Sequence, residues 1–295
     1  MFNAEECSSV KSTSDIGHGT LDIGRIGCVP YLNSKPLIFG IEDQVHLDVP
    51  SALARSLRAG ELDCALVPIV EYLEHPHYQI LPAICIASRG PVRSVYLAYR
   101  GPLSGLKTVF LDPSSRTSSL LLEVILSEFF GLETEYLDPM KTEAGPGDAR
   151  LIIGDPALLQ RARLLESGWN VLDLGEAWSD STSLPFVYAC WLVPEGVNAM
   201  PYLEILTRAR DEGLQHLDDI VRAERRFSEK MVRSYFKDAV CYDFGAEEIK
   251  GILEFQRLLK KRGWIQQESE LKLAPSLNTD HLTLNDVSRD PILRE

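Results

Sequence analysis

The chain has 295 residues, of which 45% are hydrophobic and 25% charged, with a net charge of −13. This composition is ordinary for a soluble globular protein with room for two lobes, and it argues against nucleic acid or an anionic membrane as a partner. No apolar run approaches the roughly 18 residues that cross a bilayer. A small anionic ligand stays compatible, because backbone amides and helix N-termini can bind carboxylates inside an acidic protein.

Residues 1–21 are polar and aperiodic, so we expect a disordered leader. They carry no apolar segment of the kind that directs secretion, which predicts a cytoplasmic protein. The six cysteines form no C-x-x-C pair and mostly lie in strand-like apolar runs, such as "DCALVP". We interpret them as small core residues of a reducing compartment, without disulfides or metal.

Strand-like and helix-like segments alternate along the chain. "IGRIGCV" predicts the first strand, and Val49-Pro50-Ser51 starts a helix that stops at Gly60. "CALVPIVEYL" predicts a strand and a turn, and "ILPAICIAS" and "SVYLAYRG" predict two further strands.

The second half of the alternation is built similarly. A strand ends at Asp112 and a helix follows the Ser/Thr cluster; another strand ends at Gly154, with Pro156 at a helix start. The segment "LDLGEAWSDSTSLP" is expected to be a loop before a strand over about 186–193. Amphipathic helices dominate after that strand.

This order predicts an α/β protein with largely parallel pairing and two lobes joined by two crossing segments, with the ligand in the cleft between them. It is the architecture of periplasmic-type binding proteins. We expect the first lobe to comprise 22–98 and 195–266, and the second 99–194. Residues 267–295 lose the helical period and are expected to form an extended or poorly ordered tail.

Four polar junctions fall at strand ends or helix starts, where α/β folds place ligands. They are Pro30–Pro36, Ser88–Ser94, Asp112–Ser119 and Gly154–Ala157. Each also has a structural explanation, since Ser, Thr and Asp commonly cap helices and Gly-Pro commonly forms turns. Four serines, a threonine and an arginine in the third junction exceed what one cap requires, which favours a carboxylate-binding site there.

Familiar catalytic signatures are missing from the sequence: there is no GxSxG, GxxxxGK[ST], HExxH or GxGxxG after a strand. His75 and His77 fall in an expected surface loop, and we do not predict metal binding there. The sequence therefore favours a site without metal or cofactor that uses neutral hydrogen-bonding groups.

The segments "RIGCVPYLNSKPLIFGIE", "PSALARSLRAGELDCALVPIVEYL", "SRGPVRSVYL" and "GDPAL" resemble the chorismate dehydratase family of the futalosine route to menaquinone, over about residues 22–265. The resemblance implies the periplasmic-binding-protein type II fold and a cofactor-free lyase. Such an enzyme converts chorismate, a dianion, to 3-[(1-carboxyvinyl)oxy]benzoate and water. Its needs are mainly orientation and charge stabilisation.

The resemblance also implies site residues. Asn33 matches the family's active-site asparagine and Ser94 a serine lining the pocket, so both are predicted to be catalytic. The proton acceptor is either a side chain or the substrate's own enolpyruvyl carboxylate. Lys35 is either a solvated loop lysine or a residue that steers the ligand. The predicted substrate-binding residues are Tyr31, Ser114, Ser115, Arg116, Thr117, Ser118, Gly154 and Asp155.

Three rival functions compete with this one. A 1,4-dihydroxy-6-naphthoate synthase on the same fold would be expected to place a histidine in the cleft, and no histidine falls at the four junctions. A non-catalytic solute-binding protein would need a secretion signal. A ligand-sensing domain of a transcription regulator would need a DNA-binding module, which we do not find before residue 22.

Overall fold

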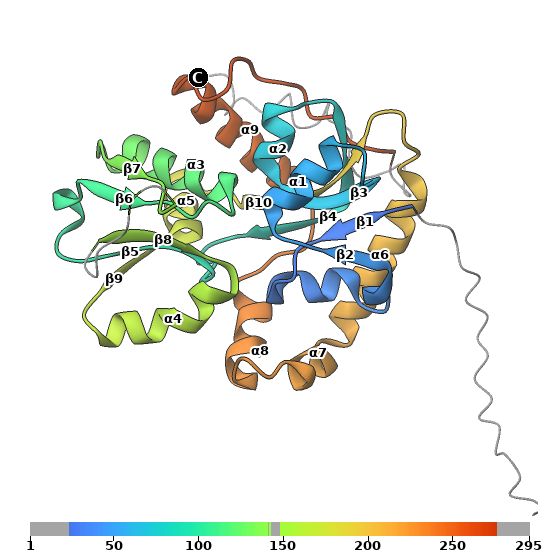
Figure 1. The fold of residues 1–295 in the computed structure, drawn as a ribbon, viewed down its shortest axis with the longest axis horizontal. Helices are drawn as coiled ribbons and strands as arrows, with labels where there is room; N and C mark the ends of the chain where they lie inside the picture. Colours follow the sequence, from blue (N-terminus) through green and yellow to red (C-terminus); the bar gives the residue numbers. More distant parts are fainter. Residues whose placement is uncertain (1–23, 141, 143–147, 276–295) are drawn as a thin grey trace, which may run out of the picture.

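The computed structural model describes residues 24–140, 142 and 148–275. They form two five-stranded sheets that lie side by side, and we refer to the bodies built on them as the first and second lobe (Figure 1). The expected leader lies outside the described residues. None of the helices in the described ranges is both long and apolar enough to cross a membrane.

The first sheet consists mostly of buried apolar residues, apart from its edge strand. Its strand order is β2 (Val45–Leu47), β1 (Ile26–Cys28), β3 (Cys64–Pro68), β10 (Phe186–Pro194) and β4 (Tyr78–Ser88). Strand β1 pairs in parallel with β2 and β3, whereas β10 runs antiparallel to both β3 and β4. Every residue of β1 and β3 is buried, as expected for strands covered on both faces.

The second sheet repeats this plan. Its order is β7 (Glu135–Leu137), β6 (Thr108–Phe110), β8 (Ala149–Ile153), β5 (Val95–Tyr99) and β9 (Asn170–Asp173). Strand β6 is parallel to β7 and β8, and β5 is antiparallel to β8 and β9. Each sheet therefore contains one strand that returns from the other lobe and reverses the local pairing.

Helices flank both sheets (Figure 1). In the first helix, Pro50 fits the first turn and the buried face carries Leu53 and Leu57. The α-helices are α1 (Pro50–Arg58), α2 (Ile69–Glu74), α3 (Arg116–Val124), α4 (Gly154–Glu166), α5 (Leu174–Thr182), α6 (Met200–Gln215), α7 (Leu217–Ala223), α8 (Glu229–Asp238) and α9 (Ala246–Lys261). Short 3-10 helices are η1 (Leu32–Ile38), η2 (Glu42–Gln44) and η3 (Leu103–Gly105), and η4 (Ile125–Phe129) continues α3 as a π-helix.

The predicted α/β fold with two lobes and two crossing segments is confirmed, and three details of the prediction are wrong. Pairing is mixed rather than largely parallel, because the returning strands β5 and β10 run antiparallel to their neighbours. The expected loop before β10 contains β9 and α5, and the expected turn after β3 is helix α2. In α5, the Asp173 carboxylate caps the helix and thereby offsets a sequence rich in Gly, Ser and Asp.

The predicted lobe boundaries remain a prediction, although the pairing itself assigns β5 to the second sheet and β10 to the first. Helix α9 packs against β10 and against α3, so the C-terminal part of the chain touches both lobes (Figure 1). The start of the expected tail is extended: Ile80 of β4 exchanges backbone hydrogen bonds with Lys272 and Ala274. Residues 276–295 lie outside the described residues.

Candidate functional site

Asn33 lies in η1, directly after the first strand of the first lobe. The Tyr242 hydroxyl donates a hydrogen bond to the main-chain carbonyl of Asn33 at 2.8 Å and fixes this turn from below. The Asn33 side chain lies beside the Tyr235 hydroxyl. The side-chain oxygen of Asn33, Oδ1, is buried and has no hydrogen-bond partner within the described part of the chain. A buried acceptor left open in this way is costly unless a ligand satisfies it.

Ser94 stands at the entry to β5, on the side of the second lobe. Both carboxylate oxygens of Asp173 hold the preceding turn, since they accept from the backbone amides of Val92 and Arg93 at 2.9 and 2.8 Å. Arg93 has a φ of 63°, a strained conformation for a residue with a side chain. The Ser94 hydroxyl is buried and accepts from the Tyr235 hydroxyl at 2.9 Å.

The start of α3 supplies several hydroxyl groups at the positive end of the helix dipole. Ser115 is the cap of this helix, and Ser118 binds it through both its amide and its hydroxyl. Thr117 is buried and accepts from the backbone amide of Val70, at the start of α2 in the first lobe, at 3.2 Å. Two helix starts from different lobes thus meet at Thr117.

The start of α4 reaches the first lobe as well. Gly154 has a φ of +63°, and a Cβ there would touch the Tyr31 ring at 3.5 Å. Its amide donates to the Ser94 carbonyl at 2.7 Å. The buried Asp155 carboxylate accepts from the Leu32 amide of η1 at 2.9 Å and from the Arg226 guanidinium at 2.6 Å.

Arg226 links this contact to a second buried carboxylate, that of Glu224. Glu224 accepts three hydrogen bonds from Arg226 and one from Lys35 at 2.7 Å. These donors, foremost the Arg226 side chain, hold the pKa of Glu224 well below its usual range. Lys35 therefore forms an ion pair with Glu224.

Most predicted site residues converge on one place between the lobes. Tyr31, Asn33, Ser94 and Gly154 are linked by the contacts above, and the Tyr31 hydroxyl lies within hydrogen-bonding reach of Ser114, just before α3. Burial raises the pKa of the Tyr31 phenol. Ser115, Ser118 and Asp155 border the same place, although their side chains serve as caps and interlobe contacts.

Arg116 is the exception, because its guanidinium points away toward Glu74 at 3.5 Å. Its side chain is half exposed. This orientation does not favour Arg116 as a carboxylate-binding group.

Four residues of the site were not predicted from the sequence: Tyr235, Tyr242, Arg226 and Asp173. The tyrosines lie in or after α8, where the helical period marks apolar positions as ordinary core. Arg226 and Glu224 lie in a charged linker between α7 and α8. No local motif reveals their contacts with the site, because Asn33, the turn before Ser94 and Asp155 are far from them in the sequence.

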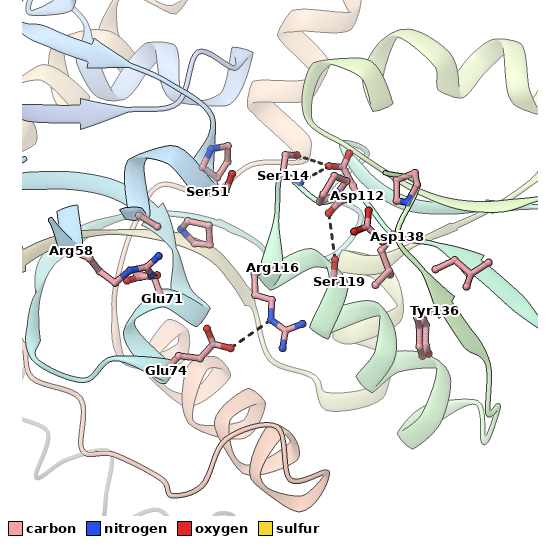
Figure 2. A pocket seen from close by; sticks show the side chains of 17 residues that line it. Ser51, Arg58, Glu71, Glu74, Asp112, Ser114, Arg116, Ser119, Tyr136 and Asp138 are labelled. Carbon is pink, nitrogen blue, oxygen red and sulfur yellow. Dashed lines mark hydrogen bonds and ion pairs between the residues drawn. The ribbon is translucent and has the colours of Figure 1, made fainter. Parts of the chain in front are cut away.

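A cavity of about 410 Å³ opens beside this cluster, between α1 and α2 on one side and α3 and β7 on the other (Figure 2). Ser114 lines this cavity and also lies beside the Tyr31 hydroxyl of the cluster. The charged side chains that line it are Arg58, Glu71, Glu74, Asp112, Arg116 and Asp138. Figure 2 shows Arg58 against Glu71 and Arg116 against Glu74, so both arginines are neutralised and two carboxylates are left over. This cavity suits a dianion less well than the uncharged cluster.

The chemistry of the cluster rests on hydroxyls, an amide and helix starts. No group of three or more His, Cys, Asp or Glu within the described residues is arranged to hold a metal ion. Histidines 46, 75, 77 and 216, the ones that the structure describes, make none of the contacts of the cluster given above.

Two mixed sheets, two returning strands and a polar cluster between the lobes define a protein of the periplasmic-binding-protein fold. Solved structures share this fold at low sequence identity. An Archaeoglobus fulgidus protein has a TM-score of 0.60 at 16% identity, over 82% of this chain and 98% of that chain. A Candida albicans protein of the generic periplasmic binding protein fold has 0.58 at 11%, over 88% and 99%. The aliphatic sulphonate binding protein SsuA of Escherichia coli has 0.56 at 15%, over 88% and 96%.

The chain belongs to the menaquinone biosynthesis family, whose model matches residues 24–261. It is 34% identical over 220 residues to a chorismate dehydratase from Thermus thermophilus, a match that covers 68% of this chain and 81% of that protein. The resemblance noted in the sequence is thereby confirmed at the level of the family.

Proposed function

We propose that the protein is a chorismate dehydratase, which converts chorismate to 3-[(1-carboxyvinyl)oxy]benzoate and water. The observation that carries the proposal is the open acceptor of Asn33, buried beside the Ser94–Tyr235 pair. A site of this kind fits a ligand that brings a hydroxyl group into a closed, uncharged place. The 34% identity to a chorismate dehydratase supports the same activity.

The substrate's two carboxylates need donors that do not require a paired cation. The starts of α3 and α4 offer backbone amides and hydroxyls at the positive ends of helices. In this proposal Ser114, Ser115, Thr117 and Ser118 bind one carboxylate, and Tyr31 and Gly154 border the ring. Asp155 keeps the lobes together rather than touching the dianion.

In the reaction, the C–H bond at the ring carbon that bears the enolpyruvyl ether breaks, and its electron pair forms the new ring double bond. The C–O bond to the hydroxyl on the adjacent ring carbon breaks, and the departing hydroxyl takes up the proton and leaves as water. The proton travels by way of the substrate's own enolpyruvyl carboxylate, as the family suggests. Aromatisation drives the step, so Asn33 and Ser94 need only hold the hydroxyl and orient the ring.

We propose a cytoplasmic location for this activity. Cys28, Cys64, Cys85, Cys190 and Cys241 are free thiols in the structure, which is typical of a reducing compartment. Burial raises the pKa of Cys28 to about 12, so this thiol is unreactive.

The purified protein mixed with chorismate tests the proposal directly. Ultraviolet absorbance should change as the diene becomes a benzoate, and mass spectrometry should find the loss of one water without added metal or nucleotide. Chorismate that stays unchanged with folded protein would contradict the proposal. The similarity to sulphonate-binding proteins favours a non-catalytic anion-binding function as the second candidate, and calorimetry of chorismate binding without turnover would support it.

A further inference from the structure

Tyr235 is fully enclosed, at 1% exposure, on the buried face of α8 that also carries Val232 and Phe236. Its hydroxyl donates to the Ser94 side chain at 2.9 Å. Burial is the main cause that raises the pKa of this phenol, so it stays protonated and remains a donor at neutral pH. A phenylalanine would fill the same space, so packing alone does not explain the hydroxyl.

The hydrogen-bonding capacity of the three side chains defines what their open ends can bind. The Tyr235 hydroxyl donates its single hydrogen to Ser94, so the hydrogen of the Ser94 hydroxyl is free to point elsewhere. The Asn33 side chain lies beside the Tyr235 hydroxyl, and its Oδ1 is the buried open acceptor.

The cluster therefore ends in one donor, on Ser94, and one acceptor, on Asn33. A hydroxyl group satisfies both at once, because it accepts one hydrogen bond and donates another. A carboxylate would meet the Ser94 donor but would confront the Asn33 oxygen with a second acceptor. A carbonyl group would fail in the same way.

We propose that Tyr235 is a positioning residue that fixes Ser94 as a donor, beside the Asn33 acceptor, toward the ring hydroxyl that leaves the substrate. The inference rests on the proposed dehydratase function and adds a residue to that site. Tyr235 does not touch the reacting atoms; it acts through Ser94, which does.

The test is a kinetic cycle with Tyr235→Phe, Ser94→Ala and the double variant, with chorismate as substrate. Tyr235→Phe should lower kcat about 10- to 100-fold, because the Ser94 hydroxyl, no longer held by Tyr235, loses its alignment with the substrate hydroxyl. KM should change by less than about threefold. The double variant should be no slower than Ser94→Ala alone, because Tyr235 acts through Ser94. Tyr72→Phe is the matched control: it removes a buried hydroxyl whose partners, Glu270 and Lys272, lie away from the cluster.

The outcomes separate the inference from the function on which it rests. If the wild-type protein leaves chorismate unchanged, the dehydratase function fails and this role with it. If the wild type is active and Tyr235→Phe keeps its kcat, the positioning role alone is overturned. Multiplicative losses in the double variant also overturn it, since two independent side chains give that result. Thermal unfolding of each variant confirms that the compared proteins are folded.

Discussion

At the scale of single residues, Asn33 and Ser94 are 61 positions apart (94 − 33), yet Ser94 binds the hydroxyl of Tyr235 and Asn33 lies beside it. The motif around Asn33 points to this residue from the sequence alone. The Tyr235 hydroxyl between the two side chains does not appear in any local pattern, because its partners are set by the packing of α8. At this scale, therefore, the sequence identifies Asn33, and only the structure identifies Tyr235.

We expect Asn33→Ala and Ser94→Ala each to lower kcat for chorismate by about 100-fold or more, because each removes a group that holds the leaving hydroxyl. Their thermal unfolding midpoints should stay within a few degrees of the wild type. Steady-state kinetics and calorimetry measure the two effects. Ser104→Ala, at an exposed position of η3, is the control. Full activity in both site variants would show that the site lies elsewhere.

At the scale of elements, the hydroxyl-rich start of α3 and the Gly-Asp-Pro start of α4 are visible in the sequence, whereas β9 and α5 are not. Gly175, the second residue of α5, packs closely against the turn that leads to Ser94. A Cβ on Gly175 would lie 2.5 Å from the carbonyl oxygen of Gly90 and 2.6 Å from the Ser88 hydroxyl. Only the contact with that turn explains the glycine, since a helix by itself disfavours one.

Gly175→Ala should therefore destabilise the protein by about 1–3 kcal/mol, through overpacking at the junction of the two lobes. Chemical denaturation measures this free energy of unfolding. Gly105→Ala is the matched control, because a Cβ there meets only the Pro102 ring at 3.6 Å. Equal stability of the two variants would contradict the close fit that the structure describes.

At the scale of the whole molecule, contacts between distant segments hold the lobes in register. The Asp155 carboxylate of α4 accepts hydrogen bonds from the Leu32 amide and the Arg226 side chain, and Arg226 in turn donates to Glu224. These charges are compensated within the protein, so they stabilise the arrangement without offering a free cation to the ligand. Removal of one partner from such a buried set leaves an uncompensated charge and is costly.

The stability of the protein should depend on Glu224 at acid pH. Its pKa in the folded chain lies well below the ordinary value of 4.5, with Arg226 as the first cause. The ionised carboxylate thus stabilises the fold above about pH 4.5, and this contribution is lost as the pH falls further toward the folded-state pKa.

Glu224→Gln should flatten the fall of unfolding free energy between about pH 4.5 and 3, by at most about 1.4 kcal/mol per pH unit for one proton. Denaturation at a series of pH values measures the slope, with Glu229→Gln in the exposed first turn of α8 as the control. A slope identical to that of the wild type would remove Glu224 from this role.

The sequence by itself determined the α/β class, most strands and helices, and the residues at the four polar junctions, because apolar periodicity and helix caps are local properties of the chain. Its motifs also indicated the family. Only the tertiary structure decided that β5 and β10 return antiparallel, that Arg116 turns away, and that Tyr235 joins Asn33 to Ser94. These features depend on contacts between residues far apart in the sequence, and no local pattern encodes which distant partner a side chain will meet.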